Sequence, residues 1–177
     1  GLWLVGMGLP LLSLWWRRLP RMAARIVPLE DPPRVSVIIA ARNEGPRIGD
    51  CLKSLLASDY PDLELIAVND RSDDETGEVM DQLAASDSRV RVVHLDSLPS
   101  DWLGKNHAMA QGASAATGQW LLFTDGDVIY APETISLAVA FSTERRLDHL
   151  TISPSMLSGS YAETALISFF GVVFSTA

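Results

Sequence analysis

Short apolar runs rich in β-branched residues alternate with segments of helical spacing along this chain, and that alternation restricts the fold more than any other feature. The first run, residues 35–40, is nearly continuous, as is typical of a strand buried on both faces. The segment that follows it carries apolar residues at helical spacing. Strands that alternate with helices indicate a parallel sheet with right-handed crossovers. The fold class is therefore α/β.

The pattern predicts strands at residues 35–40, 63–68, 90–95, 119–124 and 147–152. It predicts helices at residues 45–58, 72–85, 106–117 and 133–142. The sequence Ser72-Asp73-Asp74-Glu75 matches a capping box, which would start the second helix at Ser72. Gly118 would cap the third helix at its carboxyl end.

Charge divides the chain of 177 residues into two unequal parts. Residues 1–34 carry a net charge of +3 and the remainder −11, which together give −8. Nucleic-acid binding needs clustered lysines and arginines on the folded body, so we expect no nucleic-acid partner. Cys51 is the only cysteine in the sequence, which excludes an intrachain disulfide and a cysteine metal cluster.

The first segment has the composition of a membrane anchor. Residues 1–16 are uncharged and rich in leucine and tryptophan, and an arginine cluster follows at residues 17–21. By the positive-inside rule, this cluster marks the cytoplasmic side of a membrane. We therefore expect a membrane location with a cytoplasmic catalytic domain. A buried core helix is the alternative, and Pro10 favours it.

The expected organisation is a transmembrane or anchor helix at residues 1–21, a linker at 22–33 and an α/β domain at 34–177. The chain begins without a methionine and ends inside an apolar run, so we expect a fragment that is truncated at both ends. The apolar tail, residues 162–177, is expected to form a core or interfacial helix.

The sequence Asp125-Gly126-Asp127 directly follows an apolar run, residues 120–124. A buried strand would thus place two carboxylates at its carboxyl end, the edge where open α/β sheets bind ligands. Carboxylate oxygens suit a hard divalent cation, and such a cation can hold a diphosphate. A helix N-cap or an Asp-Gly turn before Pro132 is the alternative, but neighbouring carboxylates repel one another without a cation.

Other polar residues are expected at the same edge. Asn43 and Glu44 follow the first strand, and Asp70 ends the second. A carboxylate can accept the N3–H of uracil, so Asp70 favours a uridine nucleotide; capping of the next helix is its alternative role. Lys105 opens a helix, where a cation beside helix amides suits a diphosphate, although a surface lysine is the alternative. Arg71 is interpreted as a surface residue.

Motifs of several other enzyme classes are missing from the sequence. It contains no phosphate loop, no Gly-x-Gly-x-x-Gly fingerprint and no Gly-x-Ser-x-Gly elbow. His94, His107 and His149 lack metal-ligand spacing, so we interpret each as a surface or hydrogen-bonded residue.

Four motifs resemble glycosyltransferase family 2 and occur in that family's order between residues 34 and 130. They are VSVIIAARNE at 35–44, VNDRSDDET at 68–76, WLGKNHA at 102–108 and TDGDV at 124–128. The resemblance implies a GT-A fold, which is a Rossmann-like, mostly parallel sheet flanked by helices. Membrane-anchored, lipid-directed members are the most similar, such as ceramide-glucosyltransferase-like and hopanoid- or carotenoid-associated enzymes.

The resemblance also implies roles for single residues. It assigns donor binding to Ala41, Arg42, Asn43, Glu44, Asp70, Lys105 and Asp125. The loop at residues 41–44 and Asp70 would contact the nucleoside. Asp127 would bind Mg²⁺ or Mn²⁺, and Asp125 would contact the ribose or the metal.

The implied reaction is inverting, metal-assisted transfer of a sugar from a nucleotide sugar, here a UDP-sugar, to a lipid or polyisoprenoid acceptor at the membrane. The general base would be an acidic residue beyond Ala177, so this fragment alone is expected to lack turnover. Two alternatives stay open: a nucleotidyltransferase, and a non-catalytic, membrane-associated module that binds nucleotide sugars.

Overall fold

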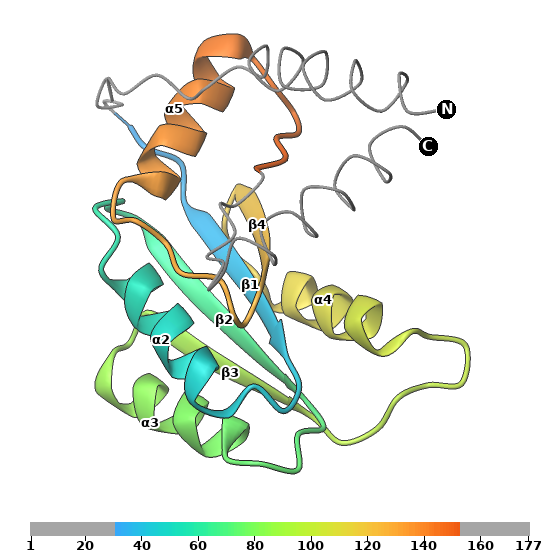
Figure 1. The fold of residues 1–177 in the computed structure, drawn as a ribbon. Coiled ribbons are helices and arrows are strands. Elements are labelled where there is room, and N and C mark those ends of the chain that lie inside the picture. Colours follow the sequence, from blue (N-terminus) through green and yellow to red (C-terminus); the bar gives the residue numbers. More distant parts are fainter. Residues whose placement is uncertain (1–30, 153–177) are drawn as a thin grey trace, which may run out of the picture. The chain divides into compact units, whose positions relative to one another are not determined.

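The structure is a computed structural model that describes residues 31–152 (Figure 1). Its elements in chain order are β1 (Val35–Ala41), α2 (Gly45–Leu56), β2 (Leu63–Asp70), α3 (Thr76–Ser86), β3 (Val90–Leu95), α4 (Gly104–Ala115), β4 (Trp120–Asp125) and α5 (Thr134–Arg145). The expected anchor at 1–21 and the tail at 162–177 lie outside the described residues. Among the residues that are described, no helix is both long and apolar enough to span a bilayer.

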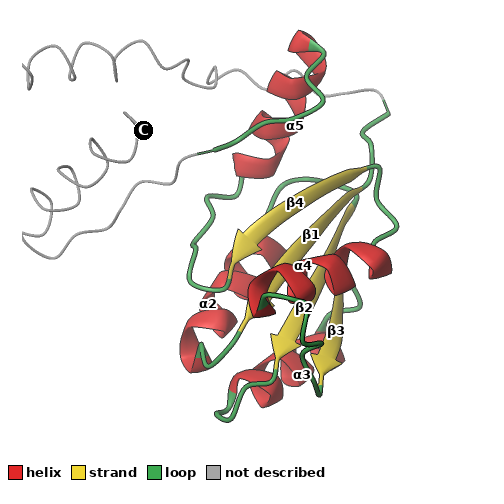
Figure 2. Cartoon of the chain, turned by 90° about the vertical axis from the view of Figure 1, so that its right-hand side faces the viewer, coloured by secondary structure: helices red, strands yellow, loops and turns green. Residues whose placement is uncertain are grey.

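The strands form one parallel sheet in the order β3-β2-β1-β4. Val35 at the start of β1 lies opposite Leu63 of β2 and Trp120 of β4, so the strands begin nearly level. Their carboxyl ends therefore meet at one edge, toward which the arrowheads point in Figure 2. The predicted α/β class with a parallel sheet flanked by helices is confirmed.

Helices cover both faces of the sheet, because side chains alternate between the faces along each strand. Val37 and Ile39 of β1 face α2, α3 and α5, and they belong to the larger apolar core. Ile38 faces α4 on the opposite side, in a smaller cluster. Figure 2 shows α4 on one face of the sheet and α2 and α3 on the other. A methyl group at Gly112 of α4 would lie 2.4 Å from Cγ2 of Ile38. Glycine is therefore what allows α4 to lie this close to the sheet.

A buried carboxylate joins three segments at the amino edge of the sheet. Glu64 of β2 is 9% exposed, and its Oε1 accepts hydrogen bonds from the Ser36 hydroxyl and from the Thr117 amide at 2.7 Å. Burial alone would raise the pKa of Glu64, but these hydrogen bonds, with Arg34 nearby, lower it below its ordinary value. The network connects β1, β2 and the turn before β4, and the Ser36 hydroxyl also accepts the Gly118 amide.

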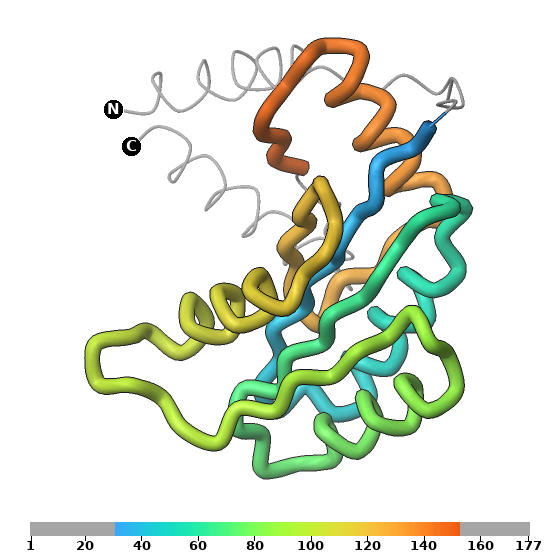
Figure 3. The backbone as a smooth tube through the Cα atoms, turned by 180° about the vertical axis from the view of Figure 1, so that it is seen from behind, coloured from blue at the N-terminus to red at the C-terminus, as the bar shows by residue number. Residues whose placement is uncertain are grey.

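Most element ends lie one to three residues from their predicted positions, and three further predictions are wrong. Helix α3 begins at Thr76 instead of Ser72, because the Ser72 hydroxyl accepts the Asn43 amide and does not cap the helix. Helix α4 ends at Ala115, so Gly118 is not its cap; a methyl group there would lie 2.6 Å from the Ser36 hydroxyl. Residues 147–152 form no strand. The trace in Figure 3 shows the long loop at residues 96–103 between β3 and α4.

Candidate functional site

A pocket of about 230 Å³ opens at the carboxyl edge of the sheet. It is lined by Ala40, Ala41, Arg42, Glu44, Asp70, Lys105, Asp125 and Asp127. Every residue that the sequence singled out as donor- or metal-binding lies on this lining except Asn43. Ala40 lines the pocket and was not among the predicted residues. Its position directly before Ala41, at the end of a predicted strand, could have indicated it.

Strand alternation places two of the carboxylates on the α4 face. Asp70 follows Ile66 and Val68 at even spacing along β2, and both of those side chains lie in the cluster against α4. On β4, Asp125 lies opposite Ala40 of β1, which packs against the same cluster. The first residues of α4 therefore approach both carboxylates. The unpaired amides of a helix start favour anions, so this end of α4 adds positive potential to an acidic pocket.

Lys105, in the first turn of α4, forms an ion pair with Oδ1 of Asp125. The two side chains are 60% and 53% exposed. An exposed pair contributes little to stability, so either partner can exchange its contact for a ligand. The pair brings a phosphate-binding cation and a predicted ribose- or metal-binding carboxylate within contact distance.

Asp70 is almost fully buried, and its Oδ1 accepts a hydrogen bond from Nε of Arg71 at 2.8 Å. This hydrogen bond raises the pKa of Arg71. A methyl group at Gly104 would lie 3.0 Å from Oδ2 of Asp70 and 3.1 Å from the Arg71 guanidinium, so glycine lets α4 start beside them. Arg71, which the sequence pattern indicated as a surface residue, is half-buried and partly neutralises Asp70. The Arg71 backbone lies in the left-handed region, with φ 57°.

Asn43 connects two loops instead of lining the pocket. Its amide donates to the Ser72 hydroxyl at 3.1 Å, and its side-chain oxygen accepts the Asp73 amide at 2.9 Å. Its φ of 56° is in the left-handed region, which asparagine tolerates better than most residues. The predicted contact between Asn43 and a nucleoside stays a prediction, and the structure places Asn43 where it shapes the loop that carries Arg42 and Glu44.

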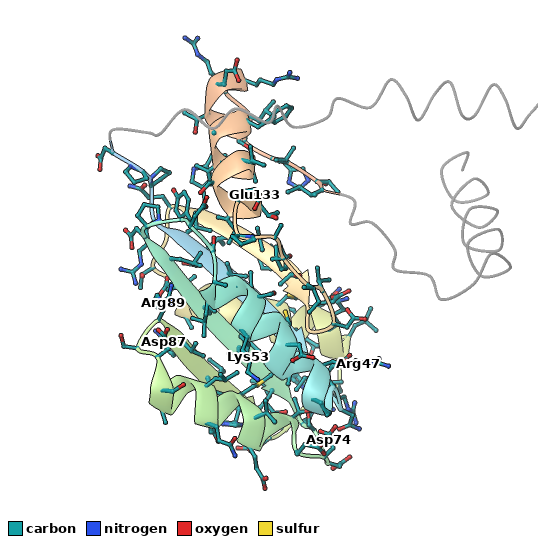
Figure 4. All side chains as sticks on the ribbon, turned by 60° about the vertical axis from the view of Figure 1, so that its left-hand side comes forward. Arg47, Lys53, Asp74, Asp87, Arg89 and Glu133 are labelled. Carbon is teal, nitrogen blue, oxygen red and sulfur yellow. The ribbon has the colours of Figure 1, made fainter. Side chains whose placement is uncertain are left out.

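Thr76 joins the loop after β1 to the loop after β2, as Asn43 does. Its hydroxyl accepts the amides of Glu44 at 2.9 Å and Gly45 at 2.8 Å, and it donates to Asp74. The hydrogen bond from the Thr76 hydroxyl lowers the pKa of Asp74. Figure 4 shows Asp74 and Arg47 at the same end of α2. Thr76 had a signal in the sequence that was not used, namely its Asp-x-Thr spacing with Asp74, which accepts its amide at 3.0 Å.

The donor set at Asp125 and Asp127 fits a divalent cation that takes its remaining ligands from a substrate. Both carboxylates are exposed and line the pocket. Within residues 31–152, no group of three or more histidine, cysteine, aspartate or glutamate side chains forms a metal site. Mg²⁺ commonly binds through one or two carboxylates and substrate phosphates, and oxygen donors also suit Mn²⁺.

The histidines differ in their surroundings. His94 contacts Asp81 at 3.0 Å and Asn69 at 3.1 Å, so it is hydrogen-bonded as expected. His107 is 8% exposed, and among the described residues its Nδ1 has no hydrogen-bond partner. Its ring packs edge-on against Trp102, with 5.5 Å between the centroids. The sequence pattern did not distinguish this buried ring from a surface histidine.

The fold and the pocket define an α/β domain with carboxylates and a lysine at the edge where such sheets bind ligands. The family model for glycosyl transferase family 2 matches residues 36–155. The chain therefore belongs to glycosyl transferase family 2, a family of transferase enzymes.

Individual relatives agree with this family. A 4,4'-diaponeurosporenoate glycosyltransferase from Staphylococcus aureus is 32% identical over 145 residues, which cover 78% of this chain and 37% of the relative. The uncharacterized glycosyltransferase EpsJ from Bacillus subtilis is 38% identical over 95 residues, covering 54% of this chain and 26% of EpsJ. The chain thus spans between a quarter and two fifths of these curated relatives.

Two solved structures share the fold. The mannosyltransferase PcManGT from Pyrobaculum calidifontis, in complex with GDP-Man and Mn²⁺, aligns with a TM-score of 0.59 and 28% identity, over 77% of this chain and 40% of PcManGT. S. aureus TarS 1-349 in complex with UDP-GlcNAc aligns with a TM-score of 0.52 and 26% identity, over 70% of this chain and 38% of TarS. The chain is therefore GT-A-like in fold.

Proposed function

We propose that this chain is the donor-binding part of a glycosyltransferase that moves a sugar from a nucleotide sugar to a lipid or polyisoprenoid acceptor. The observation that carries the proposal is the convergence of Asp70, Lys105, Asp125 and Asp127 on one pocket. Membership of family 2 supports the reaction class.

The pocket offers a separate group for each part of a nucleotide sugar. Lys105 and the start of α4 hold the diphosphate, because a cation and free helix amides both favour phosphate oxygens. Asp70 and the loop at residues 41–44 contact the nucleoside. Asp127 and Asp125 hold Mg²⁺ or Mn²⁺. When bound, this cation neutralises the charge that develops on the leaving diphosphate.

The acceptor and the location belong to the same proposal. The relative named for 4,4'-diaponeurosporenoate supports a lipid-type acceptor. An anchor at residues 1–21 would hold the domain at 34–177 on the cytoplasmic side of the membrane, beside such an acceptor. Displacement by the acceptor hydroxyl would be inverting, and we assign its general base to none of the described residues.

Nucleotide preference tests the proposal. Asp70 can accept the N3–H of uracil, so UDP should bind the chain more tightly than GDP in the presence of Mn²⁺. The Asp70→Ala substitution should reduce the ratio of UDP affinity to GDP affinity about tenfold, because the hydrogen bond from uracil to a charged acceptor is lost. Calorimetric titration of both nucleotides into both proteins measures it. Equal binding of UDP and GDP by the unsubstituted chain would contradict the uridine assignment, and absence of binding by either would contradict donor binding.

A further inference from the structure

Asp127 lies in a short segment after β4, residues 125–130, here called the Asp loop. Its side chain is exposed and lines the pocket, so packing on the side chain itself does not fix its direction. A carboxylate that binds a cation has to be held within a fraction of an ångström of its productive position. The question is therefore what holds the backbone of the Asp loop.

The first end of the loop is attached to α2. The Cys51 thiol, fully buried, lies 3.7 Å from the Asp125 carbonyl oxygen and donates to it. Burial raises the pKa of Cys51 to about 12, so the thiol keeps its proton. A methyl group at Gly126 would lie 3.1 Å from Cβ of Ala41 and 3.2 Å from Cδ1 of Ile48. The loop backbone therefore lies directly on the end of β1 and on α2.

The second end of the loop returns to the same helix. The Tyr130 amide donates to the Ser54 hydroxyl at 3.1 Å, and that hydroxyl donates to the Cys51 carbonyl at 2.7 Å. Cys51 and Ser54 are three residues apart, so they lie on neighbouring turns of one face of α2. Both ends of the Asp loop are thus attached to the same short piece of α2.

The Tyr130 side chain closes the loop against the strand that precedes it. Its hydroxyl donates to Oγ1 of Thr124 at 2.7 Å, and Thr124 is 7% exposed. Burial raises the pKa of Tyr130, which keeps the hydroxyl protonated as a donor. Removal of one partner leaves the other buried without a hydrogen bond. This costs more free energy of folding than the intact hydrogen bond contributes.

We propose that Tyr130 and Ser54 are positioning residues that hold the Asp loop on α2, so that the Asp127 carboxylate stays directed at a cation in the pocket. This inference rests on the proposed function, because the cation belongs to the proposed donor site. Residues that orient metal ligands typically change metal affinity 10- to 100-fold when they are substituted.

Two substitutions test the proposal on the full chain. Tyr130→Phe removes only the hydroxyl. Ser54→Ala removes the hydroxyl that accepts the Tyr130 amide and donates to the Cys51 carbonyl. Each should weaken binding of Mn²⁺ with UDP about tenfold. Each should also speed amide hydrogen exchange of residues 127–130, measured without added metal. Ser54→Thr, which keeps a hydroxyl, should restore both properties.

Two control variants separate positioning from general stability. Tyr60→Phe removes a tyrosine hydroxyl that donates to the Pro33 carbonyl, before the start of β1. Ser86→Ala removes a hydroxyl that bonds back to Leu83 near the end of α3. Both controls should leave Mn²⁺ affinity and exchange of the Asp loop unchanged, even where they lower the melting temperature.

The outcomes are distinct. Exchange rates of the Asp loop in Tyr130→Phe and Ser54→Ala that equal those of the controls would overturn the proposal. Faster exchange with unchanged Mn²⁺ affinity would overturn it as well. The hydrogen bonds would then hold the loop without directing Asp127 at the cation. If the unsubstituted chain binds neither Mn²⁺ nor UDP, the proposed function fails. The claim that Asp127 is positioned for a cation then fails as well, even if faster exchange in the variants confirms that the hydrogen bonds hold the loop.

Discussion

Lys105 and Asp125 form an ion pair inside the pocket, and each is more than half exposed. At the scale of single residues, this contact means that Lys105 occupies a carboxylate which the proposed cation would also use. A cation has to compete with Lys105 for Asp125, whereas a diphosphate offers Lys105 a new partner. Binding of the cation and of the diphosphate should therefore assist each other.

Removal of Lys105 separates these two effects. Lys105→Ala should tighten binding of Mn²⁺ alone by up to about fivefold, because exposed ion pairs contribute about 0.2–1 kcal/mol. The same substitution should weaken UDP binding about tenfold, because a charged hydrogen bond is lost. Lys53→Ala, on the exposed side of α2 (Figure 4), is the matched control and should change neither. Calorimetry with Mn²⁺ and UDP measures both, and unchanged Mn²⁺ affinity in Lys105→Ala would contradict the competition.

At the scale of elements, each predicted strand and helix with strong apolar periodicity is present, except the segment at residues 147–152. A short apolar segment becomes a strand only when a neighbouring strand pairs with it, and its own sequence does not specify that partner. The start of α3 was misplaced for a related reason. Ser72 has the composition of a cap, but its hydroxyl is used by Asn43, 29 residues away in the chain.

The residues of the pocket could be predicted from the sequence, whereas the contacts that hold the Asp loop on α2 could not. Parallel strands share a carboxyl edge, so Asp70 and Asp125 could be placed together from the strand pattern alone. The contacts of Cys51 and Ser54 with the Asp loop join residues more than 70 positions apart. No local pattern indicates such contacts, because they depend on how α2 packs beside β4.

Glu64 links β1, β2 and the turn before β4, so its ionisation should affect how these elements hold together. Its pKa in the folded protein lies below its ordinary value of 4.5. Its contribution to stability is therefore complete above pH 4.5 and is lost as the pH falls through the lowered pKa. Glu64→Gln should lower the free energy of unfolding at pH 7 by about 1–3 kcal/mol.

The acid dependence should change in the same variant. Glu64→Gln should lose less stability than the unsubstituted chain as the pH falls below 4.5, because it has no carboxylate to protonate at this site. Glu78→Gln, at an exposed position of α3, is the control and should keep the normal acid dependence. Urea unfolding at several pH values measures the difference. Parallel pH profiles for Glu64→Gln and the unsubstituted chain would contradict the role of Glu64.

At the scale of the whole molecule, the buried Glu64 network and the proposed donor pocket lie at opposite edges of one sheet. The amino edge holds the buried Glu64 network. The carboxyl edge gathers charged residues around an open pocket, most of them exposed and Asp70 buried. This separation lets the charged edge change its partners while the core keeps the strands in register. Substitutions of the exposed residues that line the pocket should therefore affect binding more than folding.

Metal-dependent binding of UDP tests the central claim most directly. Calorimetry should show that the chain binds UDP with Mn²⁺ and that removal of the metal with a chelator abolishes binding. Asp127→Asn should weaken this binding at least tenfold at an unchanged melting temperature, because the exposed Asp127 supports the cation and not the core. Asp101→Asn, an exposed position outside the pocket lining, should bind normally. Equal affinities of Asp127→Asn and the unsubstituted chain for UDP in Mn²⁺ would contradict the account.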